Sequence, residues 1–171
     1  MKAAFLDRDG VINHDTGYTW RIDDFTLIDG CVDALKALAD AGYALIIVTN
    51  QSGIGRGYYS EDDYQQLTLW YLDQLQQQGV TITAVYHCPH APNDRCDCRK
   101  PEPGLLLRAA QEHAIEMQHS LMIGDKLSDM QAAQAAGVPN YYLVGPQADS
   151  VQGYDGKTAA SLWHCVKQWL M

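Results

Sequence analysis

The sequence predicts an α/β fold in which helices cover both faces of a parallel β-sheet. Short apolar runs alternate with amphipathic segments along most of the chain. Near-continuous apolar runs are typical of strands buried on both faces of a parallel sheet, and alternation with helices favours right-handed crossovers. With 171 residues, of which 47% are hydrophobic and 19% charged, the chain fits a single domain spanning residues 1–171.

The local patterns place the individual elements. Apolar runs predict strands at 2–6, 44–48, 80–86, 121–123 and 141–144. Helical periodicity predicts helices at 32–41, 61–75, 103–114, 128–136 and 158–170. Ser60 and Asp63 form a capping box before the second helix, Pro103 is tolerated in a first turn, and Gly42 and Gly137 are good helix stops.

Polar residues follow the apolar runs directly. Asp7 follows the first strand, Thr49 and Asn50 follow the second, and Gly124 and Asp125 follow the fourth. In parallel sheets the ligand lies at the carboxyl ends of the strands, so we expect these side chains to converge on one site. The alternative for each residue taken alone is an ordinary loop or helix-cap role.

The acidic residues at these ends need a counter-charge. Asp7, Asp9, Asp125 and Asp129 would repel one another at close range, and a buried carboxylate without a partner is costly. Hard carboxylate oxygens suit Mg²⁺, which would also bind a phosphate oxygen during phosphoryl transfer. The pattern therefore indicates magnesium-dependent phosphate chemistry.

A second metal site is indicated by Cys88, His90, Cys96 and Cys98. Three thiolates and an imidazole make a full tetrahedral set for Zn²⁺, and four protein ligands leave no open position, so the zinc would be structural. The alternative is a cluster of free thiols. This loop ends at Arg99 and Lys100. A bound metal would hold the loop rigid, so that both cations point towards the substrate.

Charge and hydropathy bear on partners and compartment. The formal net charge is −9, whereas nucleic-acid binding needs a basic face, so we expect no nucleic-acid partner. The apolar run at 2–6 is too short for a signal peptide, and no run approaches the roughly 20 apolar residues of a membrane span. We expect a cytoplasmic monomer that does not bind a membrane.

The motifs resemble those of the haloacid dehalogenase-like (HAD) superfamily of phosphohydrolases. They are DRDGV at 7–11, TNQ at 49–51, KP at 100–101 and GDKLSD at 124–129, and they stand in the family order. The resemblance implies a Rossmann-like, HAD-type sheet. The segments between the motifs are too short for a separate cap domain, so we expect an open site bordered by loops.

The resemblance also implies roles for the motif residues. Asp7 would attack phosphorus as the nucleophile, and Asp9 would act as the general acid and base. Thr49 and Lys100 would bind the transferring phosphoryl oxygens. The Asp7 carboxylate, the Asp9 backbone carbonyl and Asp125 would bind Mg²⁺. The remaining acidic residue, Asp129, would lie behind these ligands or cap the following helix.

Longer stretches resemble one subfamily, which removes the 7-phosphate of D-glycero-D-manno-heptose 1,7-bisphosphate to give heptose 1-phosphate in the biosynthesis of nucleotide-activated heptose for lipopolysaccharide. They include DTGY at 15–18, TNQSGIGRG at 49–57, CPH at 88–90 and CDCRKP at 96–101. The resemblance implies that the partner is a sugar bisphosphate. The implied substrate-binding residues are Asp15, Thr16, Gly17, Tyr18, Asn50, Gln51, Ser52, Arg99 and Lys126.

Among these residues Arg99 is our choice for the distal phosphate, because a guanidinium binds phosphate in bidentate fashion. Arg56 is a further cation near the motifs, and its alternative is a solvated loop charge. The alternative for 15–18 is a plain turn. The stretch between His90 and Cys96 is short, which leaves the preferred anomer of the sugar phosphate open.

Three other functions fit part of the pattern. A histidinol-phosphate phosphatase shares the motifs and the zinc loop, but its substrate carries a single phosphate and needs no distal arginine. A catalytically inactive, zinc-stabilised binding module has no reason to retain Asp7, Asp9, Lys100 and Asp125 together. A nucleic-acid 3′-phosphatase is disfavoured by the acidic net charge.

Overall fold

The computed structural model describes all residues, 1–171, and contains one parallel sheet of six strands in the order β3-β2-β1-β4-β5-β6. The strands are β1 (Lys2–Leu6), β2 (Tyr43–Asn50), β3 (Ala84–Cys88), β4 (Leu121–Gly124), β5 (Asn140–Val144) and β6 (Lys157–Ala159). Every neighbouring pair is parallel. The predicted α/β class is therefore confirmed.

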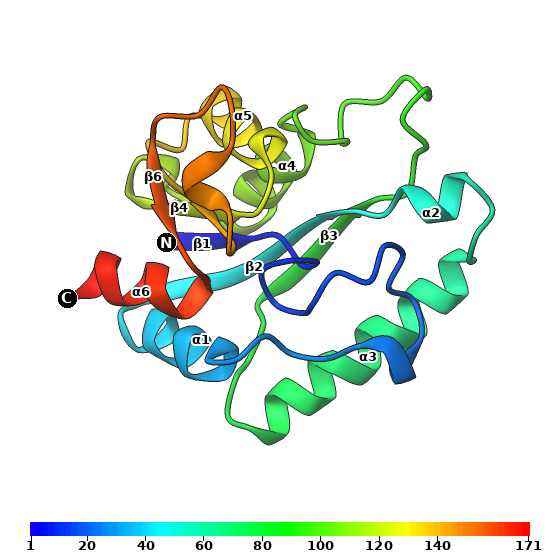
Figure 1. The fold of residues 1–171 in the computed structure, drawn as a ribbon, viewed down its shortest axis with the longest axis horizontal. Coiled ribbons are helices and arrows are strands. Elements are labelled where there is room, and N and C mark those ends of the chain that lie inside the picture. The colour runs from blue at the N-terminus through cyan, green and yellow to red at the C-terminus, as the bar shows by residue number, and fades with distance from the viewer.

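Helices cover both faces of this sheet (Figure 1). They are α1 (Cys31–Asp40), α2 (Ser52–Gly55), α3 (Glu61–Gln77), α4 (Gly104–His113), α5 (Leu127–Ala136) and α6 (Leu162–Leu170), with 3₁₀ turns η1 (Ile22–Asp24), η2 (Met117–His119) and η3 (Ala148–Ser150). In Figure 1, α1, α3 and α6 lie on one face and α4 and α5 on the other. These five helices all contribute to the two cores on the sheet, and none forms a separate cap.

The side chains of the central strands explain why the apolar runs do not alternate. On β1, Ala4 and Leu6 point into the core beneath α1, α3 and α6, whereas Ala3 and Phe5 point into the core beneath α4 and α5. Successive side chains of a strand point to opposite faces, so a strand covered on both faces must be apolar at every position.

The third strand is shorter than the apolar run that predicted it. Pairing with β2 begins at Ala84, not at Val80. Val80 is 2% exposed, and its backbone N–H donates to the carbonyl of Leu75 at the end of α3. The first part of the run therefore buries apolar surface at a helix end, and the predicted start of the strand is wrong.

The predicted helix at 158–170 is also wrong at its start. Residues 157–159 form β6, in which Thr158 pairs with Leu143 and Ala159 with Val144. The helix α6 begins only at Leu162, where the hydroxyl of Ser161 accepts a hydrogen bond from the backbone N–H of His164. A three-residue edge strand carries no period of its own, so its partner strand had to be known to find it.

The strand order places the candidate site. β1 lies between β2 and β4, and the chain continues from β1 to β2 on one side and from β3 back to β4 on the other. Ligand sites of open parallel sheets lie at the carboxyl ends of the strands where the order reverses in this way. The three strand ends that precede Asp7, Gln51 and Asp125 therefore meet at one edge of the sheet. No helix has the length and apolar character that a membrane span requires.

Candidate active site

A buried lysine links the residues at these strand ends. The Nζ of Lys100 lies 3.0 Å from Asp7 Oδ1 and 2.6 Å from Asp129 Oδ1, and it donates to the carbonyl of Val48 at 2.8 Å. Lys100 is 3% exposed, and the two carboxylates are 7% and 1% exposed. Its three donors therefore meet three acceptors, which satisfies a buried ammonium group.

This cation sets the ionisation of the nucleophile candidate. Burial opposes the charged form of Asp7, but the charge of Lys100 and its hydrogen bond outweigh burial and hold the pKa of Asp7 below its ordinary value. Burial likewise opposes the charged form of Lys100, but Asp129 and Asp7 raise its pKa. Asp7 is thus an anion at neutral pH, as a nucleophile must be.

Asp129 joins the site to the start of α5. Its Oδ2 accepts a hydrogen bond from the backbone N–H of Lys126, 3.1 Å away, and its Oδ1 pairs with Lys100. Burial, followed by the charge of Asp7, raises the pKa of Asp129. A Cβ on Gly124 would overlap Asp129, which explains glycine at that position. Asp129 thus caps a helix and holds the catalytic lysine candidate.

One oxygen of the Asp125 carboxylate lacks a partner. Its Oδ1 is buried without a hydrogen bond, and burial, together with the charge of Asp7, raises its pKa to about 8. Oxygens of Asp7, Asp125 and Asp129 all lie within 4.8 Å of one another. A divalent cation would satisfy the orphaned oxygen and offset the repulsion, so the donor set fits Mg²⁺. Gly10, at φ 85°, makes room for Asp125, whose carboxylate a Cβ there would overlap.

A cavity of about 530 Å³ opens above these carboxylates. Most of the predicted residues line it: Asp7, Asp9, Asp15, Gly17, Tyr18, Asn50, Gln51, Ser52, Arg99, Lys100 and Lys126. Thr49 is fully buried and Thr16 Oγ1 contacts Thr19 Oγ1 at 2.6 Å, and neither lines the cavity. Asp125 lines a neighbouring cavity of about 380 Å³.

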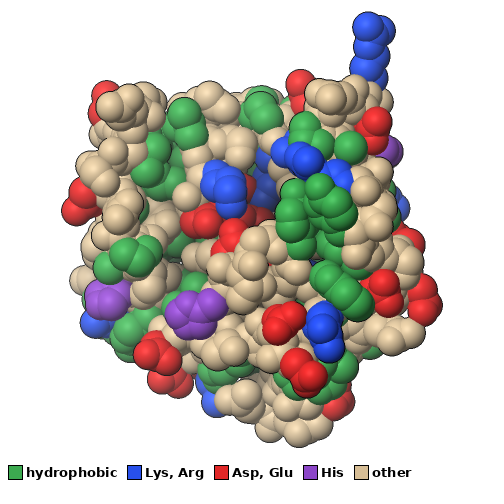
Figure 2. All heavy atoms as spheres, turned by 45° about the vertical axis from the view of Figure 1, so that its right-hand side comes forward, with side chains coloured by type: hydrophobic (Ala, Val, Ile, Leu, Met, Phe, Trp, Pro, Cys, Tyr) green, Lys and Arg blue, Asp and Glu red, His purple; other side chains and the backbone are tan.

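Side chains of both charges line the main cavity. Figure 2 shows Lys and Arg side chains (blue) next to carboxylates (red) on this face. Arg56, Arg99 and Lys126 belong to the cavity wall. Lys126 Nζ lies 3.8 Å from Asp15 Oδ2 and 3.6 Å from Asp125 Oδ2, whereas the two guanidinium groups form no ion pair within the protein. The site is therefore locally rich in cations although the protein is acidic.

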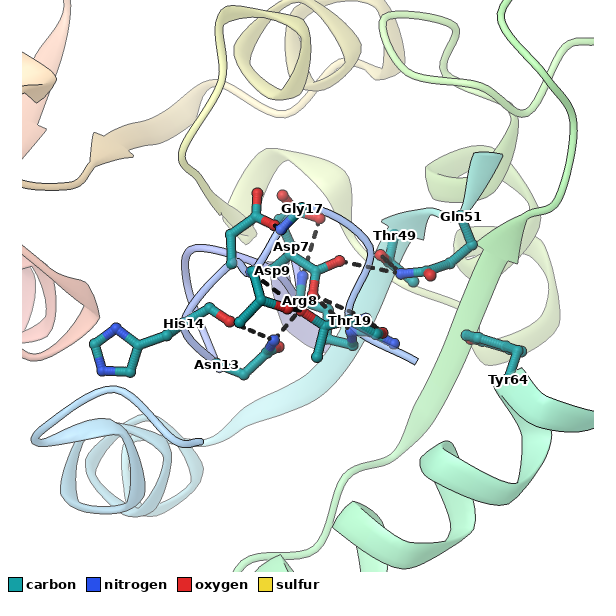
Figure 3. A network of polar contacts seen from close by, with 12 residues as sticks. Asp7, Arg8, Asp9, Asn13, His14, Gly17, Thr19, Thr49, Gln51 and Tyr64 are labelled. Carbon is teal, nitrogen blue, oxygen red and sulfur yellow. Dashed lines mark hydrogen bonds and ion pairs between the residues drawn. The ribbon is translucent and has the colours of Figure 1, made fainter. Parts of the chain in front are cut away.

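The Asp9 carboxylate is held by a network of donors (Figure 3). Arg8 donates to Asp9 Oδ1 through Nε at 3.2 Å and Nη2 at 2.8 Å, and Asn13 Nδ2 donates to the same oxygen at 2.9 Å. Gln51 Nε2 donates to Oδ2 at 3.2 Å. Arg8 is completely buried and also donates to the carbonyl of Thr19.

Sequence reasoning assigned no role to the supporting residues. Arg8 could have been found, because an arginine between two motif aspartates has an obvious partner. Asn13 and Thr19 carry no signal before the loop conformation is known. The cavity wall also includes Tyr59 and Ser128, to which the sequence assigned no role, together with Arg56, Pro101 and Asp129, which the motifs had already pointed to.

The Cys/His cluster is assembled in the loop after β3. Cys88 Sγ lies 3.8 Å from Cys96 Sγ and 3.3 Å from His90 Nδ1, and Cys98 Sγ lies 3.2 Å from the same nitrogen. A tetrahedral zinc with bonds of about 2.3 Å to sulfur requires sulfur atoms about 3.8 Å apart. All four ligand atoms lie within 4.8 Å of one another, so the residues could hold a metal ion.

This loop is tied to the end of β2 at both of its ends. At its start, the N–H of Gln51 donates to the carbonyl of Cys88 at 2.8 Å. At its end, the side chain of Asn50 accepts from the N–H of Lys100 at 3.0 Å and donates to the carbonyl of Lys100 at 3.1 Å. Lys100 is therefore bound directly to the end of β2, at the point where the Cys/His loop ends.

Comparison with known proteins identifies relatives over most of the chain. A model of HAD-hydrolase-like proteins matches residues 97–144. D-glycero-beta-D-manno-heptose-1,7-bisphosphate 7-phosphatase of Photorhabdus laumondii is 51% identical over 84% of this chain and 80% of its own. The corresponding alpha-anomer phosphatase of the same organism is 46% identical over 84% and 82%. The beta-anomer enzyme of Escherichia coli K12 is 44% identical over 98% and 95%.

A solved structure agrees with these relatives. D,D-heptose 1,7-bisphosphate phosphatase from B. bronchiseptica, crystallised with magnesium and phosphate, superposes with a TM-score of 0.92 and 31% identity. The alignment covers 99% of this chain and 98% of the other. The backbone similarity thus extends over the whole sheet and the Cys/His loop.

The raised pKa of Asp125 predicts a pH dependence in the metal-free protein. Because the folded protein binds this proton more tightly than the unfolded chain does, stability is lost as the pH rises from 3.8 towards about 8. Mg²⁺ must displace the proton at low pH, so the Mg²⁺-induced rise in Tm should be larger at pH 8 than at pH 6. Thermal unfolding at both pH values measures it.

Two variants control this measurement. Asp125→Asn should abolish the Mg²⁺-induced shift, while Asp155→Asn, at an exposed position, should leave it unchanged. A Mg²⁺ shift of equal size at both pH values would contradict the prediction.

Proposed function

This chain belongs to the haloacid dehalogenase-like phosphohydrolases, and from that membership we propose that it removes the 7-phosphate of D-glycero-D-manno-heptose 1,7-bisphosphate. The relatives named above carry that activity in their names and cover most of the chain. The observation that carries the proposal is the ionised Asp7 beside a buried Lys100 at the floor of a cavity rich in cations. Such a site suits a substrate with two phosphates.

The proposed reaction proceeds in two steps. A carboxylate oxygen of Asp7 attacks phosphorus, the bond between phosphorus and the C7 oxygen breaks, and Asp9 gives its proton to the departing alkoxide. A water molecule then attacks the aspartyl-phosphate while Asp9 takes a proton from it. Inorganic phosphate leaves, and Asp7 returns to its carboxylate form.

Lys100 is proposed to stabilise the negative charge on the transferring phosphoryl group, since its ammonium already lies beside the attacking carboxylate. Thr49, at the end of β2, is proposed to help bind the transferring phosphoryl oxygens. Asp7, Asp125 and the backbone carbonyl of Asp9 would hold Mg²⁺, which would neutralise charge on the phosphoryl oxygens.

The substrate is proposed to lie along the cavity wall. Asp15, Tyr18 and Ser52 offer polar groups for the sugar hydroxyls, and Arg99 is proposed to bind the 1-phosphate. The Arg99 guanidinium forms no ion pair within the protein and is free to bind an anion. Histidinol phosphate has no second phosphate and gives this arginine nothing to bind.

The Cys/His cluster is proposed to hold a structural Zn²⁺. The sulfur spacing fits a tetrahedral ion, and all four positions are filled by protein ligands. The ion would fix the loop that delivers Arg99 and Lys100 to the site. We therefore propose that zinc supports catalysis through Lys100, without contacting the substrate.

A substrate panel tests the proposed function. We expect Mg²⁺-dependent phosphate release to be fastest from heptose 1,7-bisphosphate, with slower release from fructose 1,6-bisphosphate and histidinol phosphate. The relatives include phosphatases named for the alpha anomer and for the beta anomer of the substrate, so both anomers are assayed. Asp7→Asn should reduce release to background because it removes the nucleophile. Faster turnover of histidinol phosphate would contradict the assignment.

Substitution of Arg99 tests the distal-phosphate contact. Arg99→Ala should raise KM for the bisphosphate about 10-fold to 100-fold, the size of a lost charge-assisted contact, and leave KM for 4-nitrophenyl phosphate nearly unchanged. The matched control is Arg95→Ala, which removes an exposed arginine of the same loop outside the cavity. Equal changes in KM for both substrates would remove the proposed contact.

Metal removal tests the zinc proposal. Metal analysis should find about one zinc per chain, and Cys98→Ser or a strong chelator should lower both Tm and kcat, because the loop carrying Lys100 loses its anchor. Cys31→Ala serves as the control, since Cys31 is a buried cysteine outside the cluster. Unchanged Tm and activity in the zinc-depleted protein would overturn the proposal.

A further inference from the structure

The two oxygens of the Asp9 carboxylate have unequal surroundings. Oδ1 accepts hydrogen bonds from Arg8 Nε, Arg8 Nη2 and Asn13 Nδ2, whereas Oδ2 accepts one, from Gln51 Nε2 (Figure 3). A carboxylate oxygen offers about two lone pairs. Oδ1 is therefore fully occupied, and Oδ2 keeps the capacity to carry a proton. Oδ2 is thus the oxygen of Asp9 that is available for proton exchange with a ligand in the cavity.

The orientation of Gln51 is fixed by its other partners. Gln51 is 3% exposed. Its Nε2 donates to Thr49 Oγ1 at 2.9 Å as well as to Asp9, and its Oε1 accepts from the hydroxyl of Tyr59 at 2.5 Å. Rotating the amide by half a turn would place Oε1 against the Asp9 carboxylate and the NH₂ group against a hydroxyl donor. The amide therefore has one favourable orientation, which directs an N–H at Oδ2.

Tyr59 in turn is held by the surrounding loops. It is 6% exposed, and its ring stacks on Trp20 with centroids 6.2 Å apart and planes 12° apart. A Cβ on Gly53 would overlap the tyrosine ring, so glycine at that position permits the packing. Burial raises the pKa of Tyr59 to about 12, which keeps its hydroxyl a donor at neutral pH.

We propose that Gln51 and Tyr59 are positioning residues for the proton transfer of Asp9. In this arrangement Tyr59 fixes Gln51, and Gln51 fixes Asp9 Oδ2 so that it faces the leaving oxygen. The proton then moves from Oδ2 to the departing alkoxide, and the N–H of Gln51 stabilises the carboxylate that remains. This inference rests on the proposed acid role of Asp9 and gives Gln51 a task other than contact with the sugar.

The test uses aryl phosphates of similar shape but different leaving-group basicity. Phenolate is a basic leaving group and needs a proton, whereas 4-nitrophenolate can leave without one. The kinetic constant to compare is kcat/KM, because it covers substrate binding and departure of the leaving group and excludes hydrolysis of the aspartyl-phosphate. Asp9→Asn provides the reference for complete loss of the acid.

Tyr59→Phe and Gln51→Leu should each lower kcat/KM for phenyl phosphate about tenfold more than for 4-nitrophenyl phosphate, a fraction of the full effect of a general acid. Tyr59→Phe removes only one oxygen atom, so the comparison can be made with this variant alone if Gln51→Leu does not fold. Tyr64→Phe is the matched control, since the Tyr64 hydroxyl is buried without a hydrogen-bond partner, and it should leave the ratio unchanged.

Two results would overturn the inference. An equal fall for both aryl phosphates would show that Gln51 and Tyr59 act on binding or on folding, and no fall for either would show that Asp9 needs no such support. A wild-type protein that hydrolyses aryl phosphates but not the heptose bisphosphate would instead contradict the proposed substrate. The two failures are therefore distinguishable.

Discussion

The ammonium group of Lys100 is the interaction on which the rest of the site depends. Two buried carboxylates, Asp7 and Asp129, come from different parts of the sheet and would be unstable so close together without a cation. Lys100 contacts both and also bonds to β2 through Val48. One buried cation thus joins β1, β2 and the start of α5, and it keeps Asp7 ionised, as its proposed role as nucleophile requires.

A lysine on a long loop is a poor anchor unless the loop itself is fixed. Here the loop is bound to the end of β2 by backbone contacts of Gln51 and by the side chain of Asn50. Zn²⁺ bound at the Cys/His cluster, as proposed, would supply a further constraint within the loop, where few apolar side chains are buried. The proposed structural metal would therefore help to hold the loop that carries the proposed catalytic lysine.

Asp9, the proposed acid and base, is supported by other loops of the cavity wall. The loop of residues 14–20 and the segment 51–59 meet through Tyr59, which stacks on Trp20 and bonds to Gln51. Asp9 is thereby held from both its own loop and the next one. Gln51 takes part in both supports, since its backbone N–H bonds to Cys88 and its side chain bonds to Asp9.

The sequence by itself determined the fold class, the convergence of strand ends and the two clusters of metal-ligand residues, because apolar runs, motif order and cysteine spacing are local properties. It misplaced the start of the third strand and missed β6, since strand limits depend on a partner strand far away along the chain. Only the tertiary structure decided that Asp125 keeps an unpartnered oxygen and that Gln51 turns towards Asp9. Hydrogen-bond partners are set by packing between loops, and no local pattern encodes them.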